Sequence, residues 1–493
     1  MPAGPTLSLP GISAFAVYVP PFKVSLEDWC QWTNNSWEKV SQVTGDSFRM
    51  PAPWQNVYTM AANAVLRLIL NNDINPETVG FLGLGTESST DNSAGAVIIR
   101  GIVDKALEQL GLAKLSRHLE VPEFKHACLG GIYALKAALR YVAYDGQGKK
   151  AIVVSADIAE YERGSSGEQT QGAGAVAMLV EMAPRLLTVD LSHCSSVSSY
   201  RGTDFRKPAA RHRIAHYQAE TTRGHDFPVF NGRYSTHAYL DAVTRAVEHM
   251  ATRFGISAHD LFRQNCALCF HRPYQQMPLK ALAFLYVRGL MHDPNSEKEA
   301  VQLCHLSGVE PSSLLAEKSL PDELMVATAD RPECDPFPMT SRVADCLRRQ
   351  VAFQSWAQEK IGLGSHLTRQ LGNLYSASLP ANLAAMLEEG FHQPQHLNAG
   401  KLVAIGYGSG DAAEALPLQL CSQWHSAAGK IGLAAALQPV VMLDRKRYES
   451  LHDRGELSGI DFQPSQEVVI SRIGQHYSQH FQDIGIEYYT YIH

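Results

Sequence analysis

The stretch FKHACLGGIYALKAAL occupies residues 124–139 and places Cys128 at the junction of two patterns. An apolar run typical of a strand leads into the cysteine, and residues at helical spacing follow it. A thiol at a helix N-terminus meets unpaired backbone N–H groups and the positive end of the helix dipole, which lower its pKa. Gly130 and Gly131 leave room for a substrate carbonyl to approach the backbone. The stretch therefore predicts an acyl-accepting cysteine nucleophile.

A second interpretation of Cys128 stays open at this point. Free cysteines are among the most buried residue types, and most of them are inert core residues. The order strand, cysteine, glycine pair and helix favours the nucleophile. The decision depends on which other reactive residues accompany the cysteine.

Composition and charge exclude several classes of protein. The chain has 493 residues, of which 45% are hydrophobic, and a net charge of −6. Without a basic patch, nucleic acid is not an expected partner. The apolar runs fall far short of the roughly 18 residues that span a membrane, and the N-terminal sequence MPAGPTLSLPG lacks the basic segment of a secretion signal. We therefore expect a cytoplasmic protein that contacts neither nucleic acid nor membrane.

The cysteines and histidines do not indicate a metal site. Nine cysteines are scattered without the spacing of a disulfide framework, which indicates reduced thiols. Cys266 and Cys269 form a C-x-x-C pair inside the apolar run CALCF, but no partner ligands follow. We interpret both as structural cysteines of a buried strand. Among the 20 histidines only His271 has an informative context.

Strand-like and helix-like segments alternate along the chain. Apolar runs of strand length, several ended by glycine or proline, are separated by longer segments with helical spacing. This alternation predicts an α/β layered fold. The expected strands are residues 13–19, 79–85, 149–156, 173–181, 266–270 and 401–407, and the expected helices are residues 54–71, 93–111 (opened by Ser93), 235–253, 277–290, 340–361 and 378–389.

Both halves of the chain place a reactive residue just after a buried strand, which hints at internal duplication. We expect one half over residues 1–185 and the other over residues 186–493. Residues from about 291 to 365 are more polar and less regular, and we interpret them as an insertion within the second half.

Three strings have to be interpreted together. GLGTESSTDNS, at residues 83–93, puts Glu87 just past a strand end, and CFHRPYQQMPLKAL, at residues 269–282, does the same for His271. With Cys128 they form the set that acyl transfer followed by carbanion chemistry requires. The cysteine accepts the acyl group, the carboxylate removes a proton from the acyl methyl, and the imidazole orients or protonates a thioester carbonyl.

These strings resemble the 3-hydroxy-3-methylglutaryl-CoA synthase family of the thiolase superfamily. The resemblance runs nearly end to end, and the joint occurrence of QGAGAVAML and GNLYSASL in the right order is specific. The strings that carry it are GISAFAVYVPPFKV (11–24), SADIAEY (155–161), GEQTQGAGAVAML (167–179), DFRKP (204–208), PVFNGRYS (228–235), FHRPY (270–274), GNLYSASL (372–379) and GYGSG (406–410).

The resemblance implies a thiolase-like α/β fold in which two duplicated halves form alternating α-β-α-β-α layers. It implies that Cys128 is acetylated, that Glu87 is the general acid/base and that His271 contacts the acetoacetyl thioester. It implies no cofactor beyond coenzyme A thioesters as substrates, and no metal. The substrate-binding positions that it implies are Asp91, Asp157, Tyr161, Thr170, Asp204, Lys280, Asn373 and Ser409.

A few positions bear on the branch of the family and on the thioester carrier. Ser409 stands near the point where thiolases have a second cysteine, which together with Glu87 favours the synthase branch. Gln276 stands where a lysine commonly meets the CoA phosphates, although Lys280 matches the second lysine of that helix. Further departures from the family pattern are Leu129, Ile132 and Asn231.

We therefore expect a hydroxymethylglutaryl-CoA synthase-like condensing enzyme. It would join an acetyl group held on Cys128 to an acetoacetyl thioester and release a 3-hydroxy-3-methylglutaryl thioester by hydrolysis. An alternative is a polyketide-pathway enzyme that adds an acetyl-derived β-branch to a β-keto thioester on an acyl carrier protein. A ketosynthase III-like acyltransferase has no counterpart of Glu87, and a non-catalytic scaffold would not need the three residues. The expected partners are acetyl-CoA, acetoacetyl-CoA or a carrier-protein thioester, and a second copy of the chain in a homodimer.

Overall fold

The structure is a computed structural model of the whole chain. It describes residues 9–91, 94–146, 148–201, 204–205, 227–228, 231–292, 296–318, 334–398 and 400–493. Within these ranges no helix is both long enough and apolar enough to cross a bilayer.

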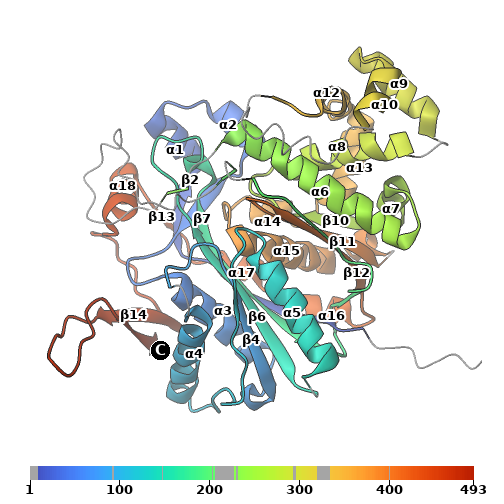
Figure 1. The fold of residues 1–493 in the computed structure, drawn as a ribbon. Coiled ribbons are helices and arrows are strands. Elements are labelled where there is room, and N and C mark those ends of the chain that lie inside the picture. The colour runs from blue at the N-terminus through green and yellow to red at the C-terminus, as the bar shows by residue number, and fades with distance from the viewer. Residues whose placement is uncertain are drawn as a thin grey trace, which may run out of the picture.

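A ten-stranded mixed sheet organises the fold (Figure 1). Its strand order is β10-β11-β12-β8-β1-β7-β6-β4-β5, and β9 pairs with β12. The strands are β1 (Gly11–Tyr18), β4 (Val79–Gly85), β5 (Glu123–Phe124), β6 (Lys150–Ala159), β7 (Gly172–Glu181), β8 (Leu187–Val189), β9 (Ser195–Ser198), β10 (Ala267–Phe270), β11 (Lys401–Gly408) and β12 (Ala412–Leu420).

The same pairing pattern occurs twice in this sheet. In the first half β4 and β6 are parallel, and β6–β7 and β7–β1 are antiparallel. In the second half β10 and β11 are parallel, and β11–β12 and β12–β8 are antiparallel. The antiparallel pair β1–β8 joins the two halves. The repeat in topology is clear although the two halves share little sequence.

Helices and sheet alternate as five layers. The helices α5 (Gly130–Tyr144) and α15 (Ser378–His392) pack between the two halves of the sheet. Helices α3 (Val57–Asn71) and α4 (Gly95–Gln109) cover the outer face of the first half, and α6 (Gly232–Phe254) and α8 (Met277–His292) cover that of the second (Figure 1). The expected α-β-α-β-α arrangement is confirmed.

The alternation of side chains along the strands explains why the layers form. In β11, Leu402 and Ala404 face the central helices, whereas Val403 and Ile405 face α6 and α8. Successive side chains of a strand point to opposite faces, so a continuous apolar run provides a core on both sides. This explains why the expected strands lack a polar face.

The region from 291 to 365 is more regular than its composition indicates. Its described parts are α9 (Glu297–Ser307), α10 (Pro311–Lys318), α12 (Pro338–Leu347) and α13 (Val351–Ile361). Leu303 and Val343 belong to the same apolar cluster as Leu282 of α8. The single helix expected over 340–361 is two helices, because Gln350 has extended backbone angles. Residues 293–295 and 319–333 lie outside the described part.

The remaining elements flank this core. Asn56 caps α3 through its side chain, and its partner Thr59 closes a capping box.

The division of the chain between residues 185 and 186 stays a prediction, and Ser93 lies outside the described residues. The other elements are β2 (Phe22–Ser25), β3 (Ser47–Met50), β13 (Val441–Met442), β14 (Glu467–Ile473), β15 (Glu487–Ile492), α1 (Leu26–Thr33), α2 (Trp37–Val43), α7 (Ala258–Gln264), α14 (Ser365–Thr368), α16 (Trp424–Ala428), α17 (Leu433–Ala436), α18 (Arg445–Arg454) and the 3₁₀ turns η1 (Pro76–Thr78), η2 (Glu168–Thr170), η4 (Tyr375–Ala377) and η5 (Pro394–Leu397).

Candidate active site

Cys128 lies in a sharp bend between a strand and the central helix α5. The strand that precedes it, β5, is only two residues long, shorter than the sequence indicates. Ala127 has a φ of 42°, in the left-handed region that residues with a Cβ seldom adopt. The bend leaves Cys128 just before Gly130, the first residue of α5, with 7% of its surface exposed.

The pKa of the Cys128 thiol departs from the sequence-based expectation. Burial raises it well above its usual value, and the nearby carboxylates of Glu87 and Asp157 raise it further. The expected lowering by the helix N-terminus is therefore wrong for this state of the site, because desolvation and two like charges outweigh the helix dipole. The thiol proton points to Glu87, with 3.5 Å between Cys128 Sγ and Glu87 Oε2.

The glycine pair after the cysteine serves helix packing rather than substrate approach. A Cβ on Gly131 would lie 2.2 Å from Ser155 Oγ and 2.7 Å from the carbonyl oxygen of Ser376. A Cβ on Gly130 would lie 2.7 Å from the carbonyl oxygen of Phe124. The start of α5 is thus pressed against neighbouring backbone, and only glycine fits there.

Asp157 holds the segment that carries Glu87. Its Oδ1 accepts hydrogen bonds from the backbone N–H groups of Glu87 and Ser88, both at 2.8 Å, and from the hydroxyls of Thr86 and Ser88. Its Oδ2 accepts from the backbone N–H of Ser376 at 2.9 Å and from the Ser376 hydroxyl. Asp157 is fully buried. Both carboxylate oxygens of Asp157 accept hydrogen bonds from the protein. In this structure Asp157 therefore positions its neighbours and offers no free oxygen to a substrate.

Three aromatic rings surround the other side of Cys128. Tyr161, Phe205 and Tyr375 form a cluster with Cys128 and Ala159. Their ring centroids are 5.9 to 6.3 Å apart in all three pairs. Tyr161 is the one ring of the three that the sequence analysis named as a site residue. The signal for Phe205 and Tyr375 was present, because both belong to strings that carry the family resemblance.

His271 presents a neutral imidazole. It follows β10, is 2% exposed, and its Nδ1 has no hydrogen-bond partner within the described part of the chain. Burial lowers the pKa of His271 to about 3. The backbone around it is fixed, because its N–H donates to the carbonyl of Ile405 at 2.7 Å and its carbonyl accepts from the Tyr239 hydroxyl at 2.8 Å. A neutral ring in this place can orient a carbonyl without carrying charge.

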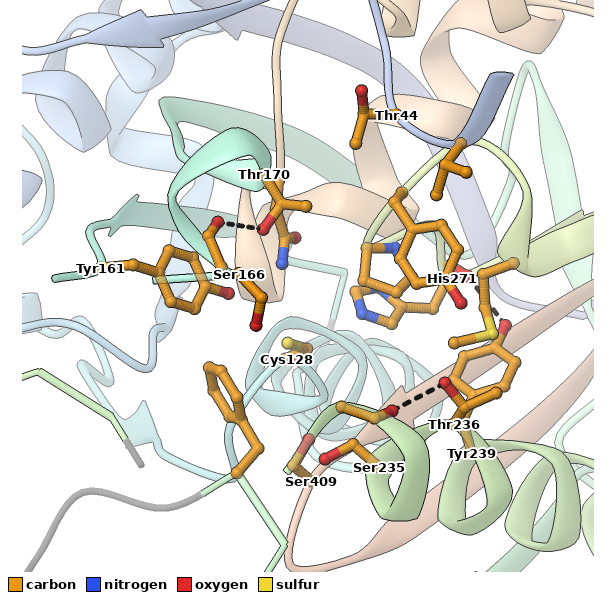
Figure 2. Close-up of a pocket in the computed structure, with 18 of the residues that line it drawn as sticks. Thr44, Cys128, Tyr161, Ser166, Thr170, Ser235, Thr236, Tyr239, His271 and Ser409 are labelled. Atoms are coloured by element: carbon orange, nitrogen blue, oxygen red, sulfur yellow. Dashed lines mark hydrogen bonds between the residues drawn. The ribbon is translucent and has the colours of Figure 1, made fainter. Parts of the chain in front are cut away.

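Cys128, Tyr161 and His271 line one cavity of about 280 Å³. Figure 2 shows the Cys128 sulfur between Tyr161 on one side and His271 on the other. The wall of the cavity also includes three more of the predicted substrate-binding residues, Thr170, Asn373 and Ser409. Wall residues that the sequence analysis did not name are Val43, Thr44, Ser166, Gly167, Gln169, Phe205, Gly232, Ser235, Thr236, Tyr239, Pro273, Tyr274, Met277 and Tyr407.

Asp204 lies behind the wall and supports it. Its Oδ1 accepts from the Ser235 hydroxyl at 2.6 Å, and its Oδ2 accepts from the Tyr407 hydroxyl at 2.8 Å. Asp204 is fully buried and is not part of the described wall. Asp204 thus lies behind Ser235 and Tyr407, which do line the cavity.

Asp91 and Lys280 are not among the residues that line the cavity. The Asp91 carboxylate accepts from the backbone N–H of Ala94 at 2.5 Å, where α4 begins. Lys280 lies on α8 next to Tyr274, with 3.4 Å between its Nζ and the tyrosine hydroxyl. Neither belongs to the described wall, although Tyr274 does. Lys280 is thus placed at the edge of the cavity.

A buried arginine meets two carboxylates near the Ser409 side of the cavity. Arg201 donates from Nε to Asp411 Oδ2 and from Nη2 to Asp241 Oδ2, both at 2.7 Å. Asp411 Oδ1 has no hydrogen-bond partner within the described residues. Burial raises the pKa of Asp411 to about 7, Arg201 opposes this, and Asp204 adds to it.

We expect the contribution of Asp411 to folding stability to decrease as the pH rises toward and through about 7. The unfolded Asp411 carboxyl ionises near about pH 3.9, whereas the folded one keeps its proton up to about 7. The contribution of Asp411 to the free energy of unfolding is full below the pKa of the carboxyl in the unfolded chain. It is lost as the pH rises through the pKa of the carboxyl in the folded protein. From about pH 6 to about pH 8 the loss is about 1 kcal/mol. Thermal unfolding of Asp411→Asn should lack this dependence, and Asp345→Asn, an exposed carboxylate, should keep it. Equal pH slopes in Asp411→Asn and the unchanged protein would contradict the assignment.

Comparison with known proteins shows which family the chain is similar to. The sequence profile described as hydroxymethylglutaryl-coenzyme A synthase N terminal matches residues 8–184. The hydroxymethylglutaryl-CoA synthase of Haloferax volcanii is 27% identical over 405 residues, which are 82% of this chain and 81% of that protein. The chain is similar to hydroxymethylglutaryl-CoA synthases over most of its length. The resemblance that the motifs carry is thereby confirmed, and the family match includes the segments that hold Glu87 and Cys128.

Solved structures confirm the fold. MvaS in complex with 3-hydroxy-3-methylglutaryl coenzyme A has a TM-score of 0.74 at 24% identity, with 98% of this chain and 99% of that chain covered. The curacin biosynthetic pathway HMG synthase in complex with acetyl donor-ACP has a TM-score of 0.66 at 17% identity, with 98% of this chain and 100% of that chain covered. The protein thus has the expected thiolase-like fold.

Proposed function

We propose that this protein condenses an acetyl group, held on Cys128, with an acetoacetyl thioester and releases a 3-hydroxy-3-methylglutaryl thioester. One observation carries the proposal. The Cys128 thiol contacts the Glu87 carboxylate at 3.5 Å, and Cys128 lies in the wall of a cavity that also includes the neutral His271. Nucleophile, base and carbonyl-orienting group are thereby brought together from three separate strand ends.

The first step would transfer the acetyl group to sulfur. The thiol has a raised pKa, so it needs a proton acceptor before it attacks. Glu87 is placed to take that proton. The Cys128 sulfur then bonds to the acetyl carbonyl carbon, the bond to the donor sulfur breaks, and the proton leaves with the donor thiol.

The second step would form the new carbon–carbon bond. Glu87 removes a proton from the methyl group of the acetyl-cysteine, which leaves an enolate. The enolate carbon attacks the ketone carbon of the acetoacetyl thioester, and the resulting alkoxide takes the proton back from Glu87. Water then cleaves the bond between Cys128 sulfur and the acyl carbon, which frees a carboxylate and restores the thiol. The neutral ring of His271 would orient the acceptor thioester.

Two assays with the purified full chain test this function. Intact-mass measurement after incubation with acetyl-CoA should show one acetyl adduct on the chain. Addition of acetoacetyl-CoA should discharge it and yield 3-hydroxy-3-methylglutaryl-CoA. A chain that takes no acetyl group from acetyl-CoA or from an acetylated carrier protein would contradict the proposal.

A carrier-protein acceptor is the second candidate, and one position favours it. Gln276 stands one residue before α8 and offers no cation to a CoA phosphate, whereas Lys280 lies on α8 beside Tyr274 of the wall. Each acceptor is best offered to the same acetylated enzyme, once as acetoacetyl-CoA and once as acetoacetyl carrier protein. A preference of more than about tenfold for the carrier-bound form would establish the polyketide-type reaction.

Lys280→Ala is expected to raise KM for acetyl-CoA without changing acyl transfer from a substrate that lacks the nucleotide. A charge-assisted phosphate contact is worth about 1.5–3 kcal/mol when well placed, which corresponds to about tenfold or more in KM. Acetyl-N-acetylcysteamine is the control substrate, and Lys430→Ala, at an exposed lysine before α17, is the control variant. An unchanged KM for acetyl-CoA would show that Lys280 does not bind phosphate.

His271→Ala is expected to impair condensation more than acetylation. The ring is not charged near neutral pH, since its pKa is about 3, so its removal costs orientation rather than charge. We expect the rate of condensation to decrease by about 10²-fold or more while the rate of acetyl transfer from acetyl-CoA changes less. His305→Ala, at an exposed histidine of α9, is the control. Equal damage to both half-reactions would instead make His271 a partner in thiol activation.

The expected setting of the enzyme belongs to the same proposal. We propose that it acts in the cytoplasm as a homodimer with thioesters as substrates and no further cofactor. Analytical ultracentrifugation of the purified chain would test the dimer. A monomer at micromolar concentration would contradict it.

A further inference from the structure

A second cavity lies in the other half of the molecule, away from Cys128. It has a volume of about 220 Å³ and is lined by residues of β8, β11 and β12 and of the segment from the end of α6 to the end of α7. Strand β11 begins at Lys401, in the wall of this second cavity, and ends next to Ser409, in the wall of the catalytic one. The two cavities therefore lie at opposite ends of one strand, and their described walls share no residue.

The pairing of three strands fixes the floor of the second cavity. Lys401 of β11 pairs with Gln419 of β12, which pairs in turn with Thr188 of β8. In the next row Val403 pairs with Pro417. Paired residues, and residues two apart in a strand, present their side chains to the same face of a sheet. Because Val403 faces α6 and α8, all five side chains lie on the outer face of the second half of the sheet.

Apolar side chains cover this floor. Phe254 is the last residue of α6, Ile256 follows it, and Leu261 comes from α7. Figure 1 shows α6 and α7 over β11 and β12. An apolar cavity of about 150 Å³ can hold a benzene molecule. A cavity of about 220 Å³ therefore has room for an aromatic ring and a small polar group.

The charged groups of the second cavity are not balanced. Its described wall contains two charged side chains, Asp190 and Lys401. The Asp190 carboxylate is already engaged, because it accepts from the backbone N–H of Ser192 at 3.0 Å and contacts the imidazole of His193 at 2.6 Å. No residue that the structure describes accepts a hydrogen bond from the Lys401 ammonium or forms an ion pair with it. The wall thus presents a cation without a partner.

We propose that this second cavity binds a small monocarboxylate with an apolar body. The carboxylate lies beside Lys401, and the body lies between Val403 and Pro417 on the floor and Phe254 and Leu261 in the cover. A ligand pocket of this kind combines an apolar lining with few polar groups that fix the orientation of the ligand. A neutral ligand would leave the ammonium without a partner, and an inorganic anion would leave the apolar wall unused. The site does not depend on the proposed condensation, because it contains none of the groups that carry it.

Titration of the full chain with phenylacetate and with phenylacetamide, followed by ligand-observed NMR, tests the proposal. The two probes have nearly the same shape and differ in charge. A ligand of this size that fits the cavity should have a Kd of about 1 mM or lower. We expect the neutral amide to bind about fivefold more weakly or less tightly still, because it cannot pair with the ammonium.

Two variants locate the bound probe. Lys401→Met keeps the length of the side chain and removes its charge, and Gln419→Glu adds a carboxylate on the strand beside it. Both side chains are exposed enough for the variants to fold. Each variant should raise the Kd of phenylacetate by about fivefold or more and leave that of phenylacetamide unchanged. Lys446→Met, at an exposed lysine of α18, is the control and should bind both probes like the unchanged protein.

Three results would each overturn the inference. The first is the absence of saturable phenylacetate binding up to about 10 mM. The second is equal affinity of the unchanged protein for the acid and the amide, which would mean that the cavity takes apolar groups without regard to charge. The third is an unchanged Kd of phenylacetate in Lys401→Met and in Gln419→Glu, which would place the ligand elsewhere on the protein.

Discussion

Cys128→Ala is expected to abolish acyl transfer, with a decrease in turnover of about 10⁶-fold. The thiol is the nucleophile of the proposed reaction, and the alanine methyl group cannot form a thioester. The fold should persist, because the cysteine contributes only a small side chain at the edge of the aromatic cluster. Intact mass after incubation with acetyl-CoA is the measurement, and the variant should show no adduct.

Cys304→Ala is the matched control, since Cys304 is also buried and free but belongs to the apolar cluster around α8. It should be acetylated like the unchanged chain. An acetyl adduct that persists in Cys128→Ala would mean that another residue is the nucleophile. A peptide map of that adduct would then identify the residue.

Glu87→Gln is expected to stop condensation, by about 10²–10⁴-fold, and to spare acetylation. The amide keeps the shape of the side chain but cannot take the methyl proton. In the acetylation step the substitution also lowers the pKa of the Cys128 thiol, because the negative charge of Glu87 raises that pKa in the unchanged protein. The neutral amide removes that charge, so thiolate forms more readily even though a proton acceptor is lost.

The two half-reactions separate these effects. Acetylation by acetyl-CoA is followed by mass, and release of 3-hydroxy-3-methylglutaryl-CoA after addition of acetoacetyl-CoA is followed by chromatography. The acetylated variant should accumulate and stay unreacted. Condensation at the unchanged rate would show that a different base acts. A variant that cannot be acetylated would show that the first step depends on the Glu87 carboxylate and cannot proceed with the amide. Glu162→Gln, at a half-buried glutamate outside the described wall, is the control.

The layered fold could be predicted from the sequence because its causes are local. Runs such as VGFLGLG and KLVAIGY are apolar on both faces, and strands buried between two helical layers need this composition. Their glycine ends put Glu87 at one strand end and Ser409 at another. The helix after Cys128 was equally visible, since its apolar residues keep a period near 3.6.

Other features depend on contacts between distant residues, which no local pattern reveals. The expected lowering of the thiol pKa followed from the helix alone, whereas the actual direction comes from Glu87 and Asp157, which are 41 and 29 residues away in the sequence. The place of Asp157 behind the Glu87 segment was hidden for the same reason, because Ser376 satisfies its second oxygen from the other half of the chain. Resemblance to a family indicates which positions matter. It does not indicate which partners a side chain contacts or in which direction they shift its pKa.

The antiparallel pair β1–β8 makes one continuous sheet out of two similar halves. The thiol and its carboxylate both come from the first half, and the imidazole comes from the second. The aromatic rings beside the thiol come from both halves, Tyr161 from the first and Phe205 and Tyr375 from the second. The surroundings of the thiol are therefore complete only when the two halves share one sheet.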